Sequence, residues 1–426
     1  MDTLTIKKTG TSRKAKIVIP SSKSYIHRYL LSALLSDGES VIDNVTFSKD
    51  IEATLSCIER LGAEVSVSPD KKTIKVKGGI KSLSEVSLYC NESASTLRFI
   101  IPVATLFADN IEYRGAESLF RRPLDPYFKL FNQNNMDYSF KEGEFLRLSG
   151  KFFEREYVIN GSVSSQFVTG LLFTLPVMEF DSVIKIEGNL ESKPYIDITL
   201  EVLKNSGIEI INNSYKTFEI RGNQSYRAGK YFAQGDYSQV AFFLVAGAFL
   251  GGIDCVNMEP CSLQGDRVIV DILKDMGADI KDIDRGFRVE KSNLKSIGTI
   301  DATDFPDIVP ILSLACALAE GTTVIKGIER LRIKECDRVF ATVDVLSKLG
   351  ADICEKDNTI VIKGKKTLSG GIASSYNDHR IAMTMAVASL VCEGSVTIEN
   401  PMSINKSYPE FYNHLELTGA VNYIKE

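Results

Sequence analysis

The chain has 426 residues, more than one typical domain holds, so two or three domains are expected. Apolar residues make up 44% of it and charged residues 25%, a balance typical of a globular protein with a sizeable buried core. The net charge of −5, without a basic stripe or arm, argues against nucleic acid as a partner, so any positive field must come from a few cations gathered locally.

Cysteine usage and the N-terminal segment indicate a cytoplasmic protein. None of the eight cysteines forms a CxxC pair and there are only three histidines, so no zinc-type site is predicted. We expect the cysteines to be reduced core residues. The N-terminal MDTLTIKKTG lacks the apolar region of a signal peptide, and the longest apolar runs, such as 240–250, are too short to cross a bilayer.

The first predicted helix follows three serines and a lysine in the segment PSSKSYIHRYLLSALL at 20–35. Ser24 is expected to cap a helix over 25–35, which contains no glycine or proline. Lys23 precedes the helix, and Arg28 shares the face of Ser24. The free N–H groups, the positive end of the helix dipole and two cations predict an anion site, with phosphate as the best candidate. The alternative is an ordinary capped helix with solvated charges.

The rest of the chain repeats at an interval of about 70 residues. One helix of each repeat is amphipathic, and the other is almost wholly apolar and expected to be buried. Short β-rich segments such as KTIKVKG and NTIVIKG fill the gaps. The amphipathic helices end at a residue suited to a left-handed turn: Gly62, Asn135, Gly207, Gly277, Gly350 and Gly419. We therefore predict an α/β protein of six repeats, each with two helices and several strands, with linkers at 10–14 and 227–230.

Polar residues gather where each apolar helix begins. In chain order they are Lys23, Ser24 and Arg28; 92–98; Ser164, Ser165 and Gln166; 236–239; 304–307; and 377–380. Each group includes a capping residue, so a stable helix start is the alternative reading. Six helix N-termini that converge on one cleft would focus a positive potential inside an acidic protein, which suits a substrate with several negative charges. Four further polar clusters lie at 121–123, 191–195, 329–338 and 405–409.

These segments, taken in order, resemble the motifs of the enolpyruvyl transferases. The matching stretches are PSSKSYIHR, ESASTLR, SSQF, SKPYIDITL, GDYSQ, LRIKECDR, DHRIAM and KSYP. The resemblance covers the whole chain and is strongest to the members that act on shikimate 3-phosphate. It implies a two-domain inverse α/β barrel-like fold with three repeats per domain. Residues 14–229 would form one domain, 1–13 and 230–426 the other, with the active site in the cleft between them.

The reaction implied by the resemblance moves the enolpyruvyl group of phosphoenolpyruvate onto the 5-hydroxyl of shikimate 3-phosphate, on the way to chorismate and the aromatic amino acids. Phosphate leaves by addition and then elimination, through a tetrahedral intermediate. No metal or organic cofactor is implied, and the enzyme would be a monomer that closes on its substrates.

The resemblance also implies roles for individual residues. Asp307 would accept the 5-hydroxyl proton, Glu335 would be the acid beside the methylene carbon, and Lys23 would assist, because addition–elimination needs one base at the alcohol and one acid at carbon. The implied shikimate 3-phosphate contacts are Lys23, Ser24, Arg28, Ser164, Ser165, Gln166, Ser192, Tyr195, Asp307 and Lys334. The implied phosphoenolpyruvate contacts are Lys23, Ala94, Arg122, Gln166, Arg338, Arg380 and Lys406.

Some positions depart from the family pattern. His27 stands where the family usually has asparagine, and Ala94 where it usually has glycine. A methyl group at position 94 is expected to intrude on the phosphoenolpyruvate site and to weaken inhibition by the longer ligand glyphosate. Arg330 replaces a frequent asparagine, so its contact stays open. The functional roles of Glu92, Asp236 and Gln239 are also open, and capping is expected for these three.

Two alternatives remain at this point. A UDP-N-acetylglucosamine enolpyruvyl transferase would use the same chemistry on another acceptor, but the reactive cysteine of that family has no counterpart in 115–127. A non-catalytic repeat scaffold, such as a ring-shaped clamp on DNA, would share the repeats, but the net charge of −5 disfavours it.

Overall fold

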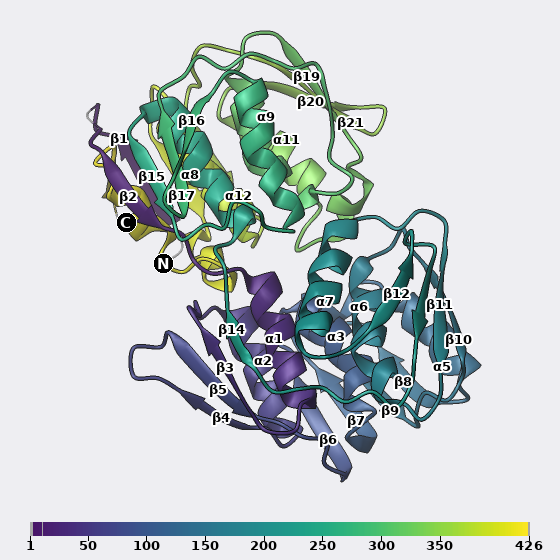
Figure 1. The fold of residues 1–426 in the computed structure, drawn as a ribbon. Helices are drawn as coiled ribbons and strands as arrows, with labels where there is room; N and C mark the ends of the chain where they lie inside the picture. Colours follow the sequence, from purple (N-terminus) through teal and green to yellow (C-terminus); the bar gives the residue numbers. More distant parts are fainter. Residues whose placement is uncertain (1–2, 11, 425–426) are drawn as a thin grey trace. The chain divides into compact units, whose positions relative to one another are not determined.

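The computed structural model describes residues 3–10 and 12–424. Residue 11 of the predicted linker and residues 1, 2, 425 and 426 of the predicted second domain lie outside the described residues. The chain divides into two units, each described by itself (Figure 1). The central unit is Ser21–Ala233, and the split unit combines the described residues of Met1–Pro20 and Gln234–Glu426.

The chain crosses between the units several residues later than predicted. Strand β2 (Ala15–Val18) pairs in parallel with β15 (Ile253–Val256), so residues 14–20 stay in the split unit. Strand β14 (Lys230–Phe232) pairs in parallel with β3 (Glu39–Asp43), so residues 230–233 belong to the central unit. The predicted boundaries at 13/14 and 229/230 were wrong, because an extended polar stretch does not show which sheet it will join.

Each unit is built from three four-stranded sheets of one topology, counted over the described residues. In every described sheet one outer pair of strands is parallel and the other neighbours are antiparallel. A parallel pair needs a crossover, and an apolar helix connects the two parallel strands in four of the six described sheets. The sheets are β14-β3-β5-β4, β6-β7-β9-β8 and β10-β11-β13-β12 in the central unit, and β22-β23-β1-β24, β16-β17-β15-β2 and β18-β19-β21-β20 in the split unit.

The strands not yet bounded follow the same pattern in both units. In the central unit they are β4 (Glu64–Val67), β5 (Thr73–Lys77), β6 (Leu83–Tyr89), β7 (Ala108–Arg114), β8 (Asp137–Lys141), β9 (Phe145–Ser149), β10 (Glu156–Asn160), β11 (Ser182–Glu187), β12 (Ile210–Asn213) and β13 (Thr217–Ile220). In the split unit they are β1 (Thr3–Lys8), β16 (Asp279–Ile283), β17 (Gly286–Glu290), β18 (Thr299–Asp301), β19 (Thr322–Lys326), β20 (Asp352–Lys356), β21 (Thr359–Lys363), β22 (Gly371–Ser374), β23 (Val396–Glu399) and β24 (Val421–Ile424).

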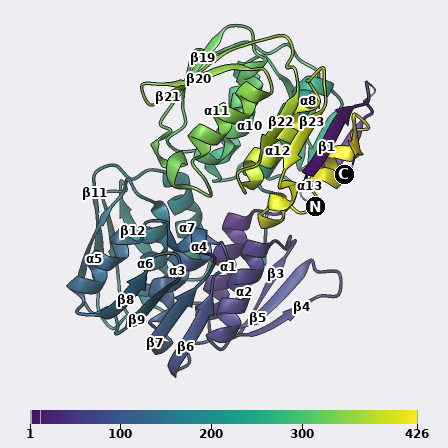
Figure 2. The same cartoon turned by 180° about the vertical axis from the view of Figure 1, so that it is seen from behind.

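The N-terminal strand lies in the sheet formed by the C-terminal part of the chain. Figure 2 shows purple β1 beside the yellow strands β23 and β22. Leu4 of β1 pairs with Ile398 of β23, and Ile6 pairs with both Val396 and Tyr423. Leu4 and Ile6 are buried, because alternate residues of the strand face the core.

The apolar helices form the interior of each unit. They are α1 (Lys23–Leu35), α3 (Ala94–Ala104), α6 (Ser165–Thr174), α8 (Tyr237–Leu250), α10 (Val309–Ala317) and α12 (His379–Ala388). In α8 every side chain from Tyr237 to Ala248 is buried. The prediction of buried apolar helices is confirmed, and each unit has its own hydrophobic core.

The amphipathic helices pack outside this interior. They are α2 (Lys49–Arg60), α5 (Asp125–Gln133), α7 (Lys193–Asn205), α9 (Val268–Asp275), α11 (Arg338–Lys348) and α13 (Phe411–Glu416), with a short α4 at Glu117–Phe120. The residue predicted to turn the chain after each has a positive φ, from 48° at Asn135 to 100° at Gly62. Short 3₁₀ helices complete the structure: η1 (Leu175–Val177), η2 (Gly265–Arg267), η3 (Pro306–Ile308), η4 (Glu329–Ile333) and η5 (Pro401–Lys406).

Two predicted helix starts and part of the cysteine prediction were wrong. Helix α1 begins at Lys23 with Ser22 as its N-cap residue, so Ser24 lies in the first turn. Helix α10 begins at Val309 rather than near Asp304, because Pro306 and Pro310 are tolerated only in a first turn and the 3₁₀ turn η3 takes up the first of them. Cys261 and Cys354 are exposed and are therefore not core residues.

Among the residues that the structure describes, no helix has the length and apolarity to cross a membrane.

Candidate active site

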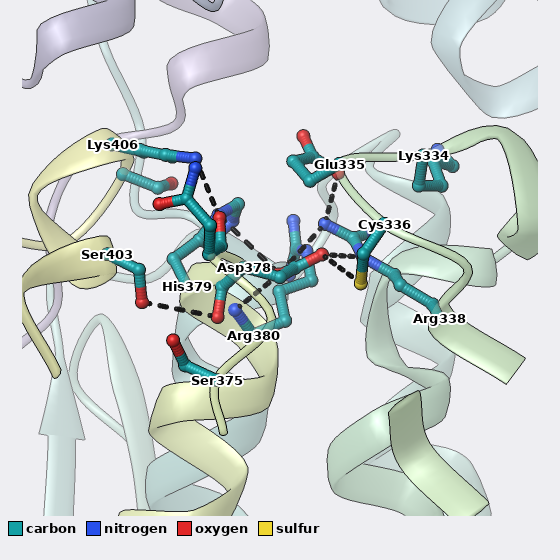
Figure 3. Close-up of polar contacts among 12 residues, drawn as sticks. Lys334, Glu335, Cys336, Arg338, Ser375, Asp378, His379, Arg380, Ser403 and Lys406 are labelled. Carbon is teal, nitrogen blue, oxygen red and sulfur yellow. Dashed lines mark hydrogen bonds and ion pairs between the residues drawn. The ribbon is translucent and has the colours of Figure 1, made fainter. Parts of the chain in front are cut away.

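In the split unit, Arg338 lies at the centre of a cluster of charged side chains (Figure 3). It is the first residue of α11, which Asp337 caps, and it is only 1% exposed. Its guanidinium donates from Nε to Asp378 Oδ2 at 2.6 Å, from Nη1 to Asp307 Oδ1 at 2.8 Å and from Nη2 to Glu335 Oε2 at 2.6 Å. Burial alone would lower the pKa of Arg338, but Asp378, Glu335 and Asp307 raise it well above its ordinary value. The guanidinium therefore stays charged.

Asp307 is shared by three cations. Its Oδ1 accepts from Lys334 Nζ at 3.2 Å as well as from Arg338, and its Oδ2 lies 3.4 Å from Arg380 Nη2. The Asp307 side chain is nevertheless 17% exposed. Desolvation lowers the pKa of Lys334 below its ordinary value, although Asp307 opposes that shift. Asp307 is thus oriented by fixed partners and still accessible, which are two requirements of a general base.

Arg380 joins the starts of two buried helices. Its Nη2 donates to Ser238 Oγ at 3.1 Å, and Ser238 Oγ donates to Asp236 Oδ1 at 2.6 Å. Asp236 caps α8 as predicted, by accepting from Ser238 N. Asp378 caps α12 by accepting from Arg380 N at 2.8 Å. The guanidinium of Arg380 is held at the mouths of α8 and α12 by these contacts.

The capping expected of two other residues was wrong. Gln239 lies inside α8 and donates from Nε2 to Ser407 Oγ at 2.7 Å. Ser93, rather than Glu92, caps α3, because its hydroxyl accepts from Thr96 N. Lys406, at the end of η5, donates to the carbonyl of Asn377 at 2.6 Å, which brings its ammonium to the start of α12 (Figure 3).

In the central unit, Arg28 is a buried cation with neutral partners. It is 2% exposed and donates to Thr199 Oγ1 at 2.8 Å, to the Ser24 carbonyl at 2.8 Å and to the Tyr195 carbonyl at 3.0 Å. Its guanidinium carbon lies 5.0 Å from the centre of the Phe99 ring. Burial lowers the pKa of Arg28 to about 10. Among the described residues no carboxylate pairs with Arg28, so its charge is available to an anionic ligand.

Lys23 and His27 occupy the same helix start. Lys23 Nζ lies 2.6 Å from Asp50 Oδ2 of α2, and its side chain is 21% exposed. His27 Nδ1 lies 2.7 Å from Thr54 Oγ1, which lies 2.7 Å from Thr96 Oγ1. Burial, together with Lys23 and Arg28, lowers the pKa of His27 well below its ordinary value, so the ring is neutral. His27 therefore links α1 to α2 and α3 by hydrogen bonds instead of adding a charge.

The start of α6 is tied to the start of α3 through Gln166. Arg98 Nη1 donates to Gln166 Oε1 at 3.0 Å, and Gln166 Nε2 donates to Ser95 Oγ at 2.8 Å. Ser164 caps α6 by accepting from Gln166 N, and Ser165 is 3% exposed. The amide of Gln166 thus has a fixed orientation.

The remaining predicted site residues lie at helix starts or just after a helix in the central unit. Ser192 is the N-cap residue of α7, with a left-handed backbone at φ 55°, and is buried. Tyr195 lies in the first turn of the same helix, and its carbonyl accepts from Arg28. Ala94 is the first residue of α3 and is half-buried. Arg122 follows α4 and is also half-buried.

The structure adds residues that sequence reasoning did not assign to the site. Asp378 orients Arg338, and the polar start of the sixth apolar helix was a signal for it. Thr199 holds Arg28 from within the SKPYIDITL segment. Asp50 pairs with Lys23 from α2, and nothing in its sequence surroundings distinguishes it from an ordinary helix-start carboxylate.

The repeated sheets and the cationic helix starts define the class of protein. The solved structure of the EPSP synthase from Acinetobacter baumannii is similar to this chain, with a TM-score of 0.83, 23% sequence identity and 100% of both chains covered. The enolpyruvyl transferase NikO from Streptomyces tendae has a TM-score of 0.79, with 17% identity over 100% of this chain and 99% of that chain. These likenesses are of fold alone. They confirm the two-domain inverse α/β barrel fold of the enolpyruvyl transferases.

Sequence comparison narrows the class to one family. The profile of the EPSP synthase (3-phosphoshikimate 1-carboxyvinyltransferase) family matches residues 7–415. The 3-phosphoshikimate 1-carboxyvinyltransferase of Clostridium novyi (strain NT) is 45% identical, with 98% of each chain covered. That of Clostridium acetobutylicum is also 45% identical, with 96% of this chain and 95% of the relative covered. The chain belongs to the EPSP synthase family, which confirms the family predicted from the motifs.

Proposed function

We propose that this enzyme transfers the enolpyruvyl group of phosphoenolpyruvate to the 5-hydroxyl of shikimate 3-phosphate and releases phosphate. The observation that carries the proposal is Asp307, an accessible carboxylate fixed by Arg338, Lys334 and Arg380. The relatives named 3-phosphoshikimate 1-carboxyvinyltransferase, at 45% identity over nearly the full length, support the choice of acceptor.

Asp307 and Glu335 supply the base and the acid. Asp307 accepts the proton of the 5-hydroxyl while the oxygen of that hydroxyl bonds to the central carbon of phosphoenolpyruvate. Glu335 gives a proton to the methylene carbon, and the tetrahedral intermediate forms. In the elimination Glu335 takes a proton back from the resulting methyl group, the carbon–oxygen bond to phosphate breaks, and the proton held by Asp307 leaves with the phosphate. Both carboxylates bind the same guanidinium of Arg338, which holds base and acid apart in a fixed geometry.

The cations of the split unit stabilise the charge of this intermediate. Arg338, Arg380 and Lys406 bind phosphoenolpyruvate in this proposal, and Lys334 binds shikimate 3-phosphate. Because carboxylates and carbonyls of the protein already fix these cations, little reorganisation is needed when charge develops. Arg338 acts mainly by orienting Asp307 and Glu335, since its three nitrogens already donate to carboxylates.

The central unit supplies the remaining contacts. Arg28, whose hydrogen-bond acceptors among the described residues are neutral, attracts the charge of shikimate 3-phosphate. The hydroxyl groups of the serines and of Tyr195, and the amide of Gln166, add hydrogen bonds without adding charge. The assigned shikimate 3-phosphate contacts in this unit are Lys23, Ser24, Arg28, Ser164, Ser165, Gln166, Ser192 and Tyr195. Lys23, Ala94, Arg122 and Gln166 are assigned to phosphoenolpyruvate. The proposed enzyme is a cytoplasmic monomer that uses no cofactor.

Phosphate release tests the proposal against its rivals. Inorganic phosphate is measured from phosphoenolpyruvate with shikimate 3-phosphate, with UDP-N-acetylglucosamine, or with no acceptor. The proposal expects release with shikimate 3-phosphate alone, accompanied by a vinyl-ether product in the proton NMR spectrum. Release with the sugar nucleotide alone would instead establish the second transferase, and release with neither would favour a non-catalytic scaffold.

Weak inhibition by glyphosate is part of the same proposal. Ala94 begins α3, where a β-carbon adds bulk beside the helix start. The Ala94→Gly variant is therefore expected to be inhibited at lower glyphosate concentrations than the wild type, with phosphoenolpyruvate as the competing ligand. Equal inhibition constants would show that the methyl group at position 94 does not matter.

A further inference from the structure

Asp266 is a buried acid with one unsatisfied carboxyl oxygen in the described part of the chain. It lies in the turn η2, is 4% exposed, and its Oδ1 has no hydrogen-bond partner among the described residues. Leaving an ionised carboxylate in such a place is costly, so the group either takes a proton or faces a ligand. The family motifs identified in the sequence do not include Asp266.

Gln264 fixes the turn that carries Asp266 to the start of α8. Its Oε1 accepts from Tyr237 N at 3.0 Å, and its Nε2 donates to the Gly235 carbonyl at 2.8 Å. The adjacent Arg267 donates to the Pro260 carbonyl at 2.7 Å. The turn is held on both sides of Asp266, so the carboxyl group has a defined position beside the mouth of α8.

Asp266 lies among the charges already described. Asp307 of η3 and Asp236, which caps α8, act on it as like charges, while Arg380 of α12 and Lys334 act as opposite charges. Burial, followed by Asp307, raises the pKa of Asp266 to about 7, although Arg380 and Lys334 oppose the shift. The carboxyl group is therefore able to change its protonation near neutral pH while it lies among the cations that the proposed function assigns to the two substrates.

We propose that Asp266 couples proton uptake to anion binding at the cationic cluster of the split unit. It binds one proton from solvent when an anion occupies the site at Arg380, and it releases that proton when the anion leaves. Only the O–H bond of the carboxyl group forms and breaks. The inference rests on the proposed function, because phosphoenolpyruvate is the anion in question.

Electrostatics gives the coupling its direction. An ionised Asp266 repels a phosphate or carboxylate bound nearby, and protonation removes that repulsion. By thermodynamic reciprocity, a bound anion raises the proton affinity of Asp266 by the same factor that protonation raises the anion affinity. Once protonated, the carboxyl group of Asp266 can also donate a hydrogen bond through its O–H. Asp266 is thus a positioning residue that acts through charge, and it takes no part in the covalent steps.

The first test compares the KM for phosphoenolpyruvate of the wild type and of Asp266→Asn from pH 6 to pH 8.5. The ratio of the wild-type KM to that of the variant is expected to be close to one at pH 6 and to rise at least threefold by pH 8.5. Protonation of the substrate itself cancels in this ratio. Asp271→Asn is the matched control, because Asp271 is an exposed residue of the neighbouring helix that pairs with Arg267, and its ratio should be flat.

A ratio of the two KM values that is constant over this pH range would overturn the proposal. This holds also if Asp266→Asn is less active than the wild type by the same factor at every pH. If that variant does not fold, Asp266→Ser replaces it, because a hydroxyl is also uncharged. The second measurement is calorimetric titration in two buffers with different heats of ionisation. The wild type should take up more protons than the variant at pH 7, and equal uptake would contradict the coupling.

The two proposals fail in distinguishable ways. If the wild type releases no phosphate from the two substrates, the proposed function is wrong, and proton uptake is then measured with inorganic phosphate as the probe. If phosphate is released but the variants show the same pH dependence as the wild type, only the role of Asp266 is wrong.

Discussion

Two buried arginines, Arg28 of the central unit and Arg338 of the split unit, have opposite surroundings. Arg338 contacts three carboxylates, whereas Arg28 contacts a hydroxyl and two carbonyls. Burial would lower the pKa of both, but the carboxylates reverse that effect for Arg338, while the pKa of Arg28 falls to about 10. The comparison shows that the partners of a buried cation decide its role. With carboxylate partners it orients those carboxylates, and with neutral partners its charge is available to bind an anionic ligand.

Removing the charge of Arg338 should have the largest effect on stability. Arg338→Met leaves the fully buried Asp378 without its partner, and breaking a buried ion pair in this way costs about 3–5 kcal/mol of the free energy of unfolding. Urea unfolding measures the loss. Arg288→Met is the control, since Arg288 pairs with Asp254 on the surface and its removal should cost about 1 kcal/mol or less. Similar losses in the two variants would mean that burial does not distinguish these pairs.

Asp307→Asn tests what Arg338 orients. Substrate binding should be nearly intact, but turnover should fall by a factor of about 10² or more, because the amide cannot accept the hydroxyl proton. Steady-state kinetics with both substrates gives the two parameters separately. Asp301→Asn is a suitable control, because Asp301 is an exposed residue at the end of β18. A near-normal rate for Asp307→Asn would remove Asp307 from the mechanism.

Arg28→Met should reverse the pattern seen for Arg338. The KM for shikimate 3-phosphate should rise by about tenfold or more, since a charge-assisted contact of roughly 1.5–3 kcal/mol is lost. The free energy of unfolding should change little, because no carboxylate is left unpaired. Arg147→Met, a change at an exposed arginine of the same unit, should leave both quantities unchanged. Strong destabilisation by Arg28→Met would show that its neutral partners matter for the fold as well.

The last prediction concerns Asp266 and the pH dependence of stability. Its pKa is raised to about 7 in the folded state, so the folded state binds the proton more tightly than the unfolded state does. The resulting stability is fully present below the ordinary aspartate pKa of about 4 and is lost as the pH rises to about 7. Asp266→Asn should therefore gain free energy of unfolding relative to the wild type as the pH rises from about 4 to about 7, and the gain should be constant above that range. Urea unfolding at several pH values checks this, and a difference that does not vary with pH would contradict it.

Much of this molecule could be predicted from the chain because the signals are local. Glycine or asparagine after each amphipathic helix, and an uninterrupted apolar run in each buried helix, depend on a few neighbouring residues, and the repeats made them visible. The motifs also singled out Asp307, Glu335 and Arg338, and the structure brings these three side chains together.

The partners of the buried charges were decided by tertiary structure. Arg28 donates to Thr199, 171 positions away in the chain, and Arg338 donates to Asp378, 40 positions away. No local sequence pattern therefore shows that one arginine contacts carboxylates and the other a hydroxyl and two carbonyls. The units to which β2 and β14 belong could not be predicted for the same reason. The sequence of an extended strand shows which side chains alternate between its faces, but not which strand it will pair with. Residue types and periodicity set which groups are charged and which are buried, while the electrostatic state of each buried charge follows from the residues that folding brings to it.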